Sequence, residues 1–329
     1  MRDYRVVING FGRIGRSVLR AWLGGGWPGL RIVGVNDIAD LETCAYLFEY
    51  DSVFGPWAGE VAAEDGALVV DGKRIAFSNI ANLRETDLTG IDLVMECTGR
   101  GSDRTFAERA LSAGARRVLV SGPSPEADWT LVLGANDGGL TRDHRIVSNA
   151  SCTTNALAPL AKLLHKEFGV VTGSMTTIHC YTGSQPTVDM PMANPARSRA
   201  AALSMVPTTT SAQALTDLVL PEIAGRIEGS AVRVPVASVS AVDLSVTTER
   251  PASAEAANAL FRATEGGILG VTRKPLVSSD LRQRSESIVM ALPETRVSKG
   301  GLLRVFGWYD NEWGFSNRML DVAMRMSKY

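Results

Sequence analysis

The segment "YRVVINGFGRIGRSVLRAWL" (residues 4–23) limits the possible folds of this chain more than any other. Its β-branched run predicts a short buried parallel strand that ends at the pattern G-x-G-x-x-G, formed by Gly10, Gly12 and Gly15. Helical spacing follows, the cluster "GGGWPG" ends that helix, and the next strand "RIVGVND" ends at Asp37. Strand, glycine turn, helix, strand and acid, in this order, are the parts of a dinucleotide site.

The residue types fit such a site for physical reasons. Gly10 permits a tight turn, Gly12 lets the backbone approach a pyrophosphate, and Gly15 lets the helix pack closely on the strand. The helix N-terminus offers free N–H groups and positive potential to phosphates. Asp37 would accept hydrogen bonds from ribose hydroxyls and repel a 2′-phosphate, so we expect NAD rather than NADP. A glycine turn that binds no ligand is the less favoured alternative.

The rest of the first half predicts a Rossmann-type, doubly wound parallel sheet. Further parallel strands are expected in "ALVVDG", "IDLVMECTG", "RRVLVSGP" and "WTLVLGAND", and the helix "RTFAERALSAGA" separates two of them. After "IVSN" the pattern changes to a helix from about residue 153 to 168 and then to alternating strands, "VTGSMTTIHCYTG" and "GSAVRVPVASVSAVDLSVTTE". These predict an α+β domain with a mainly antiparallel sheet. Residues 181–202 predict a long ordered loop with a functional or interfacial role.

Composition excludes several classes of function. The chain has 329 residues, enough for two domains, with a net charge of −1 and no basic stripe, so nucleic-acid and membrane-surface roles lack electrostatic support. It has no signal-peptide pattern and no apolar run long enough for a membrane span. Four cysteines without a C-x-x-C pair predict neither a disulfide framework nor a metal site. We expect a cytoplasmic protein.

One cysteine has the setting of a nucleophile. Cys152 lies in "SNASCTTN", where small polar residues lead into a helix, and a helix N-terminus is expected to lower the pKa of a thiol. A cysteine nucleophile usually needs a base. His144 lies in a charged turn and His165 beside a lysine on a helix, so both are expected at the surface, whereas His179 lies in the strand "TTIHCYT" among small hydroxyl residues. We predict that Cys152 reacts and that His179 is its partner.

With these residues in view, the chain resembles the phosphorylating glyceraldehyde-3-phosphate dehydrogenase family along nearly its whole length. The segments that carry the resemblance are "INGFGRIGR", "SNASCTTN", "TTIHCYT", "PTTT", "VRVP" and "WYDNEWG" with "SNR". The resemblance implies an NAD-dependent oxidation of a phosphorylated aldehyde through a hemithioacetal and a thioester on Cys152, with His179 as the base. Inorganic phosphate then releases the acyl phosphate.

The resemblance also implies roles for further residues. Ser151, Thr153, Arg197 and Thr210, with the neighbouring Ser211, would bind the phosphates together with Thr182 and Arg233, the last two on the substrate side. Arg13, Ile14, Asp37, Ser121 and Asn311 fall on NAD-contact positions, and Asn311 would orient the nicotinamide amide. The implied domains are 1–151 for NAD, 152–312 for catalysis, and a helix at 313–329 that returns to the NAD-binding domain. The loop at 181–202 implies a homotetramer.

Several positions depart from the family pattern. Gly183, Ser184, Met192, Ala193 and Ala196 differ on the substrate-phosphate side, and Gly101 and Ala81 differ near the adenine. Glyceraldehyde 3-phosphate is the expected substrate, and erythrose 4-phosphate or another sugar-phosphate aldehyde is the first alternative. A semialdehyde or N-acyl-phosphate reductase would usually prefer NADP, which Asp37 disfavours. A non-catalytic NAD-binding relative would not need both Cys152 and His179.

Overall fold

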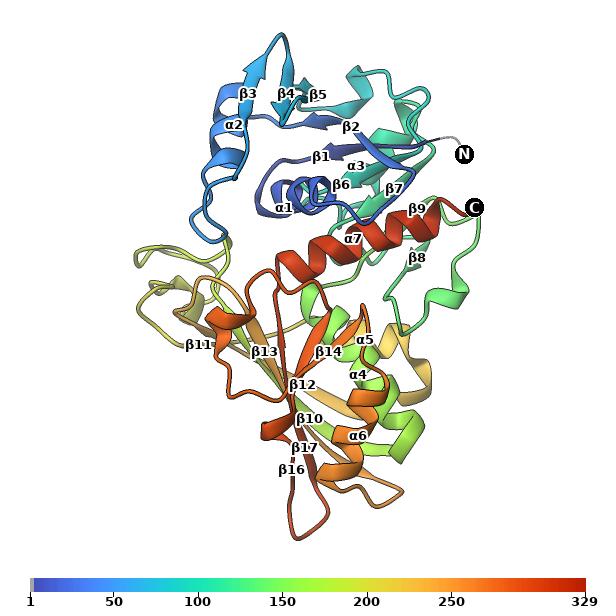
Figure 1. The fold of residues 1–329 in the computed structure, drawn as a ribbon, viewed down its shortest axis with the longest axis vertical. Coiled ribbons are helices and arrows are strands. Elements are labelled where there is room, and N and C mark those ends of the chain that lie inside the picture. The colour runs from blue at the N-terminus through green and yellow to red at the C-terminus, as the bar shows by residue number, and fades with distance from the viewer. Residues whose placement is uncertain (1–2) are drawn as a thin grey trace. The chain divides into compact units, whose positions relative to one another are not determined.

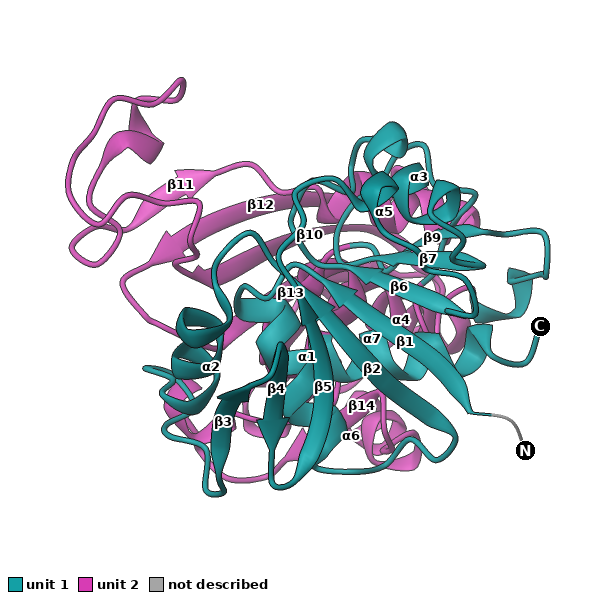
Figure 2. Cartoon of the chain, turned by 90° about the horizontal axis from the view of Figure 1, so that it is seen from above, with its two compact units in different colours: residues 1–131, 137–150, 316–329 teal, residues 132–136, 151–315 magenta. Residues whose placement is uncertain are grey.

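In the computed structural model, which describes residues 3–329, the chain divides into two compact units, coloured separately in Figure 2. Unit 1 comprises residues 1–131, 137–150 and 316–329, and unit 2 comprises residues 132–136 and 151–315. The predicted boundaries lie after residues 151 and 312, whereas the units change at 150/151 and 315/316. Residues 132–136 belong to unit 2 although they precede the predicted boundary.

Unit 1 is built on a nine-stranded sheet in the order β3-β4-β5-β2-β1-β6-β7-β9-β8 among the described residues (Figure 1). Its strands are β1 (Tyr4–Asn9), β2 (Leu30–Asn36), β3 (Val61–Glu64), β4 (Ala67–Val70), β5 (Lys73–Ser78), β6 (Leu93–Glu96), β7 (Arg117–Val120), β8 (Trp129–Thr130) and β9 (Ile146–Ser148). Its helices are α1 (Arg13–Leu23), α2 (Leu41–Glu49) and α3 (Arg104–Ser112). Strands β5-β2-β1-β6-β7-β9-β8 are mutually parallel, which confirms the doubly wound sheet.

The core of this sheet consists of the β-branched runs that the sequence marks. Val6 and Ile8 of β1 and Val94 of β6 have no exposed surface, because neighbouring parallel strands are covered on both faces. The last helix, α7 (Trp313–Met326), contributes its residues from 316 onward to this unit. Within it, Asp321 accepts a hydrogen bond from the Trp27 indole at 2.7 Å, and the Met326 carbonyl accepts one from Arg117 at 2.6 Å.

Two strand predictions in unit 1 are wrong in part. The segment "ALVVDG" forms β4, but β4 is antiparallel to both β3 and β5, because tight turns connect the three strands. The segment "WTLVLGAND" is a strand only at Trp129–Thr130, and a turn follows. Leu131 and Val132 are nevertheless fully buried. An apolar run therefore indicated burial here rather than a strand.

Unit 2 is built on a mixed sheet in the order β11-β12-β10-β13-β17-β15-β14, with β16 paired to β17. Its strands are β10 (Val170–Cys180), β11 (Val206–Thr208), β12 (Ile227–Val234), β13 (Ser240–Thr248), β14 (Leu269–Thr272), β15 (Ile288–Ala291), β16 (Arg296–Val297) and β17 (Leu303–Tyr309). Helices α4 (Cys152–Phe168), α5 (Ala212–Val219) and α6 (Ala254–Ala263) lie on one side of it (Figure 1).

The sheet is mainly antiparallel, as predicted, and β10 has one of its parallel neighbours. Strand β10 is antiparallel to β13 but parallel to β12, so that His179 lies beside Arg233 in the register. The long loop predicted at 181–202 extends over residues 181–205, with one short 3-10 turn at Ala196–Ser198. This loop follows β10 directly, and β11 after it pairs with β12.

Candidate active site

The glycine turn of unit 1 has the geometry of a phosphate-binding loop. Gly10 has φ +95°, which strongly favours glycine, and a Cβ on Gly15 would lie 2.1 Å from the Gly10 carbonyl oxygen. Gly12 is the N-cap of α1, no side chain caps that helix end, and a Cβ on Gly12 would meet no atom within 4 Å. The turn therefore leaves open space beside the N–H groups of a helix N-terminus, an arrangement that suits an anionic group.

The other predicted cofactor residues of unit 1 surround this turn. Asp37 follows β2, and its carboxylate accepts hydrogen bonds from the N–H groups of Phe11 at 2.5 Å and Ala39 at 2.9 Å. Ser121 follows β7, and its N–H donates to the Glu96 carbonyl at 2.9 Å. The Arg13 side chain forms an ion pair with Asp51. A cofactor contact by Arg13 would therefore use its backbone rather than its guanidinium group.

In unit 2, the start of α4 positions Cys152. Ser151 is the N-cap, and its hydroxyl accepts a hydrogen bond from the Thr154 N–H at 3.1 Å. Cys152 is the first residue of the helix, and its Sγ lies 3.6 Å from Nε2 of His179 near the end of β10. The structure thus brings together the two residues predicted to carry out the chemistry.

The position of the proton on the His179 ring decides whether Nε2 can accept a proton from the thiol, and the contacts of Nδ1 bear on this position. Nδ1 lies 2.7 Å from the Cys180 carbonyl oxygen and 2.6 Å from Nη1 of Arg233, and these two contacts favour opposite tautomers. The carbonyl oxygen can only accept, and Arg233 also donates to that oxygen at 3.0 Å. A base role for His179 requires the proton on Nδ1, donated to this carbonyl oxygen, because only then is the Nε2 lone pair directed at Cys152.

Burial shifts both pKa values. It lowers the pKa of His179 to about 4, and the charge of Arg233 acts in the same direction, so the ring is a neutral base near pH 7. Burial also raises the pKa of the Cys152 thiol, although Arg233 and hydrogen bonds from Thr153 oppose this shift. The lowered pKa expected from the helix N-terminus is therefore wrong, because desolvation of the thiolate outweighs the opposing effects. A base in contact with the thiol must therefore take up its proton as the sulfur attacks, and Nε2 of His179 is the atom within reach.

Tyr309 belongs to this site, although no role was predicted for it. Its hydroxyl lies 2.8 Å from Oγ1 of Thr153 on α4 and 2.8 Å from Oγ1 of Thr177 on β10. Its ring also meets the His179 ring edge to face, with centroids 6.0 Å apart. Tyr309 thereby connects the elements that carry the thiol and the imidazole. The signal was present in "WYDNEWG", where a polar aromatic residue ends a strand.

Asn311 lies on the same side of unit 2. Its Oδ1 accepts hydrogen bonds from the Cys180 thiol at 3.1 Å and from the Ser240 hydroxyl at 3.4 Å. All three residues are buried. The amide group of Asn311 is thus held in one orientation by contacts within unit 2.

The predicted phosphate ligands fall into two groups. Arg233 contacts His179 and Cys180, and Thr153 is buried with its hydroxyl bonded to Tyr309. Ser151 caps α4, and its hydroxyl is bonded to Thr154. The others lie on the loop after β10 or at the start of α5, and their hydrogen bonds are local: Thr182 with Ser184, Arg197 with Asn194, and Thr210 with Ala212, next to Ser211.

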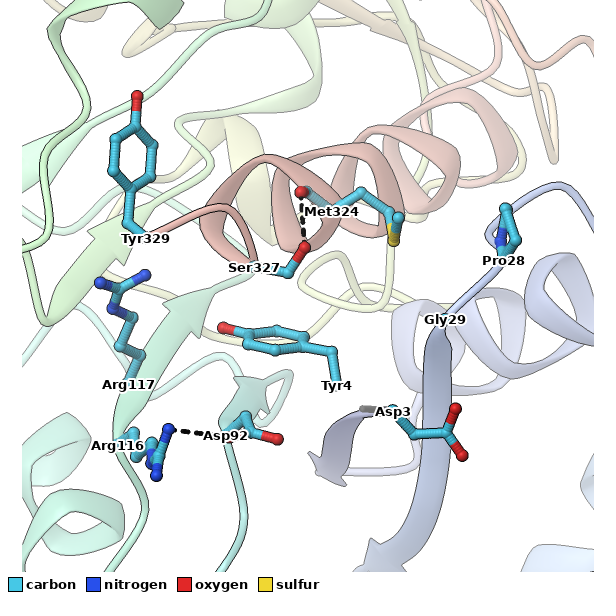
Figure 3. A pocket seen from close by; sticks show the side chains of 10 residues that line it. All are labelled: Asp3, Tyr4, Pro28, Gly29, Asp92, Arg116, Arg117, Met324, Ser327 and Tyr329. Atoms are coloured by element: carbon cyan, nitrogen blue, oxygen red, sulfur yellow. Dashed lines mark hydrogen bonds and ion pairs between the residues drawn. The ribbon is translucent and has the colours of Figure 1, made fainter. Parts of the chain in front are cut away.

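A cavity of about 360 Å³ in unit 1 has no part in this chemistry (Figure 3). It lies at the amino ends of β1 and β7, where Arg116 pairs with Asp92 at 3.5 Å. The Arg117 guanidinium group donates to the carbonyl oxygens of Met326 at 2.6 Å and Arg142 at 3.2 Å. Both arginines in this cavity therefore already have partners. In addition, ligands of parallel sheets bind at the carboxyl ends of the strands, which is the opposite edge of the sheet.

Other kinds of site are not found in the part of the chain that the structure describes. Residues 3–329 contain no cluster of His, Cys, Asp and Glu suited to a metal ion. None of the helices in this range combines the length and the apolar character that spanning a membrane requires. The four cysteines are free thiols.

Comparison with known proteins decides the family. Residues 4–104 match the model of the glyceraldehyde 3-phosphate dehydrogenase NAD binding domain, and residues 151–311 match that of the C-terminal domain. The chain belongs to the glyceraldehyde 3-phosphate dehydrogenase family. It is 47% identical to a glyceraldehyde-3-phosphate dehydrogenase of Xanthobacter flavus and 48% identical to one of Pseudomonas aeruginosa, each over 98% of both chains. An enzyme of this name from Geobacillus stearothermophilus is 45% identical over 97% of both chains.

The family membership confirms the cofactor and the fold class that the sequence predicted. The first unit contains the family's NAD binding domain, which agrees with the open glycine turn and with Asp37 at the end of β2. The erythrose 4-phosphate alternative is not favoured, because the relatives named here are all glyceraldehyde-3-phosphate dehydrogenases.

Proposed function

We propose that this protein oxidises D-glyceraldehyde 3-phosphate to 1,3-bisphosphoglycerate, with NAD as hydride acceptor and inorganic phosphate as second substrate. The observation that carries the proposal is the distance of 3.6 Å between Cys152 Sγ and His179 Nε2, in a chain of this family. A thiol paired with a neutral imidazole suits nucleophilic attack on an aldehyde.

In the first step, Nε2 of His179 accepts the thiol proton and the Cys152 thiolate attacks the aldehyde carbon. A C–S bond forms, the carbonyl π bond breaks, and the oxygen takes the proton back from His179. The resulting hemithioacetal carries a hydroxyl group, and His179 is neutral again. The raised thiol pKa makes the positioned base necessary. Arg233 stabilises the thiolate through its charge, and Thr153 does so through its hydrogen bonds.

In the oxidation step, His179 removes the proton of the hemithioacetal hydroxyl while the hydrogen on carbon leaves with its electron pair. Bound NAD supplies the acceptor for that hydride. The pKa of about 4 keeps His179 unprotonated and able to act as a base near pH 7. The product of this step is a thioester on Cys152.

In the last step, an oxygen of inorganic phosphate attacks the thioester carbon, the C–S bond breaks, and the Cys152 thiolate leaves. A thiolate is a good leaving group, so one residue serves attack and release. We propose Ser151, Thr153, Arg197, Thr210 and Ser211 as ligands of the attacking phosphate. We propose Thr182 and Arg233 as ligands of the phosphate on the substrate. An arginine at such a position can present a bidentate fork to phosphate oxygens.

The test is NADH formation from NAD and inorganic phosphate, with glyceraldehyde 3-phosphate and erythrose 4-phosphate compared. We expect phosphate-dependent turnover of the three-carbon aldehyde. A Cys152→Ser variant should lose essentially all of this turnover while it keeps its affinity for NAD. Turnover of the four-carbon aldehyde alone would overturn the substrate. It would point to Ser184, Met192 and Ala193 in the loop after β10 as the altered specificity residues.

The same proposal includes a homotetramer. The loop after β10 exposes apolar side chains, with Val188 71%, Leu203 84% and Met205 73% exposed, which is costly unless another surface covers them. Light scattering coupled to size exclusion should give four times the 35.2 kDa mass of one chain. A monomeric mass at micromolar concentration would contradict this part.

The four free thiols support a reducing, cytoplasmic location.

A further inference from the structure

A row of polar side chains crosses the sheet of unit 1 at the carboxyl ends of four neighbouring strands. Ser78, Asn36, Asn9 and Glu96 are the last residues of β5, β2, β1 and β6. The register pairs Ser78 with Asn36, Asn36 with Asn9, and Asn9 with Glu96. Residues at one level of a parallel sheet direct their side chains to the same face, so these four side chains form a continuous row. Asn36, Asn9 and Glu96 are each at most 3% exposed.

A backbone donor fixes the direction of the hydrogen bonds at one end of the row. The Ile80 N–H donates to Oδ1 of Asn36 at 3.0 Å, and the Ser78 hydroxyl donates to the same atom at 2.8 Å. The Asn36 amide nitrogen must then donate, and it does so to Oδ1 of Asn9 at 2.8 Å. The Asn9 amide nitrogen in turn donates to Oε2 of Glu96.

A second backbone donor fixes the other end. The Thr98 N–H donates to Oε1 of Glu96 at 2.9 Å, and the Thr98 hydroxyl is bonded to the same oxygen. Glu96 therefore receives donors on both of its oxygens, one set from each end of the row. Only an ionised carboxylate accepts on both sides, since an amide or a protonated carboxyl group would set a donor against a donor at one end.

The segment that Glu96 holds packs directly on the cofactor turn. A Cβ on Gly10 would lie 2.6 Å from the Thr98 nitrogen, so residues 97–98 form the wall against which the turn folds. The backbone extends this contact, because the Cys97 N–H donates to the Asn9 carbonyl oxygen at 2.7 Å. Gly101 closes the other side, since a Cβ there would lie 2.9 Å from Cγ of Glu96.

We propose that Glu96 is a positioning residue for NAD. The Glu96 carboxylate connects residues 97–99 through Asn9 to the glycine turn and thereby fixes the conformation of that turn. Glu96 does not touch the cofactor in this proposal and acts only through Asn9 and Thr98. The inference rests on NAD binding by unit 1. It adds a residue that the G-x-G-x-x-G pattern does not include.

The cost of burying this carboxylate indicates a specific role. Burial raises the pKa of Glu96, and hydrogen bonds from Thr98 and Asn9 oppose that shift. A glutamine would fill the same space without the desolvation cost of a charge. It would not supply acceptors at both ends, and this requirement explains an acid at the end of β6.

The experiment is a double-variant cycle with NAD binding measured by calorimetry. Glu96→Gln turns one acceptor into a donor that faces the Asn9 amide, and Asn9→Asp sets two carboxylates against each other. Each single change should weaken NAD binding by about tenfold or more. When Glu96→Gln and Asn9→Asp are combined, the introduced amide donates to the introduced carboxylate and every hydrogen bond regains a partner. This double variant should recover binding to within about threefold of the unaltered protein.

Kinetic constants separate positioning from a general loss of structure. Glu96→Gln should raise KM for NAD by about tenfold while kcat at saturating NAD stays within about twofold. If Glu96→Gln binds NAD as tightly as the unaltered protein, or if the double variant binds no better than the single variants, the proposal is wrong.

Two further measurements keep these outcomes distinct. Should Glu96→Gln fail to fold, Thr98→Val, which removes only the hydroxyl donor, should still weaken NAD binding several-fold, and unchanged binding would overturn the proposal. If the unaltered protein does not bind NAD, the result would instead contradict NAD binding by unit 1, on which the proposal for Glu96 rests.

Discussion

At the residue scale, Arg233 is the charged group that acts on both members of the thiol–imidazole pair. It lies beside His179 in the register of β10 and β12, and its Nη1 is 2.6 Å from Nδ1. Its charge lowers the pKa of Cys152 and that of His179. One cation thus favours the thiolate, which attacks in the first step, and the neutral imidazole, which acts as the base in the oxidation step.

Arg233→Gln should therefore shift the ionisation of Cys152 to higher pH. We expect slower alkylation by iodoacetamide near neutral pH, and a pH midpoint of alkylation above that of the unaltered protein, because the stabilising charge is lost. Arg233→Lys keeps the charge and should restore most of the rate. An unchanged midpoint in Arg233→Gln would show that the charge of Arg233 does not affect the pKa of the Cys152 thiol.

Tyr309→Phe should destabilise unit 2 although it removes a single oxygen atom. The hydroxyls of Thr153 and Thr177 would lose a buried partner, at a cost of about 1–3 kcal/mol in the free energy of unfolding. Chemical denaturation measures this loss. Tyr46→Phe, at a side chain that is 61% exposed, is the matched control and should change stability by less than about 0.5 kcal/mol.

Thr177→Val in the Tyr309→Phe background distinguishes a lost hydrogen bond from a packing effect. If the hydroxyl network is the cause, the second change should cost less than it does in the unaltered protein, because its partner is already gone. Strict additivity of the two changes would contradict this explanation.

At the element scale, the three glycines of the β1–α1 turn serve different purposes. Gly15 faces the Gly10 carbonyl oxygen inside the protein, whereas Gly12 faces open space at the start of α1. Gly15 is thus required by the fold, whereas the fold leaves room for a side chain at position 12, and we propose that a phosphate of NAD uses this room.

Gly15→Ala and Gly12→Ala should separate these two requirements. Gly15→Ala forces α1 away from β1 and should cost about 1–3 kcal/mol in the free energy of unfolding. Gly12→Ala should leave stability within about 1 kcal/mol of the original but weaken NAD binding at least tenfold, because its Cβ occupies the phosphate space. Thermal unfolding and calorimetric titration measure the two effects. Tight NAD binding by Gly12→Ala would show that the phosphates do not approach this position.

At the scale of the whole molecule, the buried His179 links stability to pH. Its pKa of about 4 in the folded chain lies below the ordinary value of 6.5, so the unfolded chain binds the proton first as the pH falls. Its contribution to stability is therefore complete above pH 6.5 and declines as the pH falls from 6.5 to about 4.

We expect the free energy of unfolding to fall by up to about 1.4 kcal/mol per pH unit within this window on account of His179 alone. Urea denaturation at several pH values measures the slope. His179→Gln removes the titrating group and should flatten the slope, although its stability at neutral pH differs. An equal slope in both proteins would assign the acid sensitivity to other groups.

Much of the site was predictable because its residues lie in local patterns. Cys152 stands at a helix start, Asp37 at a strand end, and Gly10, Gly12 and Gly15 at fixed spacing, so each could be assigned from its neighbours in the chain. Tyr309 and Glu96 were not assigned, since their partners are distant in sequence: Thr153 is 156 residues from Tyr309, and Asn9 is 87 residues from Glu96. Periodicity carries no information about such pairs.

The sequence by itself therefore determined the doubly wound sheet and the glycine turn, and it singled out the thiol and the imidazole that the fold places 3.6 Å apart. These depend on the spacing of apolar residues and on the chemistry of side chains in short segments. Only the tertiary structure decided that β4 is antiparallel, that β12 runs parallel to β10, and that burial raises the pKa of Cys152, which the helix N-terminus was expected to lower. The direction of β12 relative to β10 depends on a pairing between segments about 50 residues apart. The pKa of a thiol depends on the desolvation and the charges that the folded protein imposes on it.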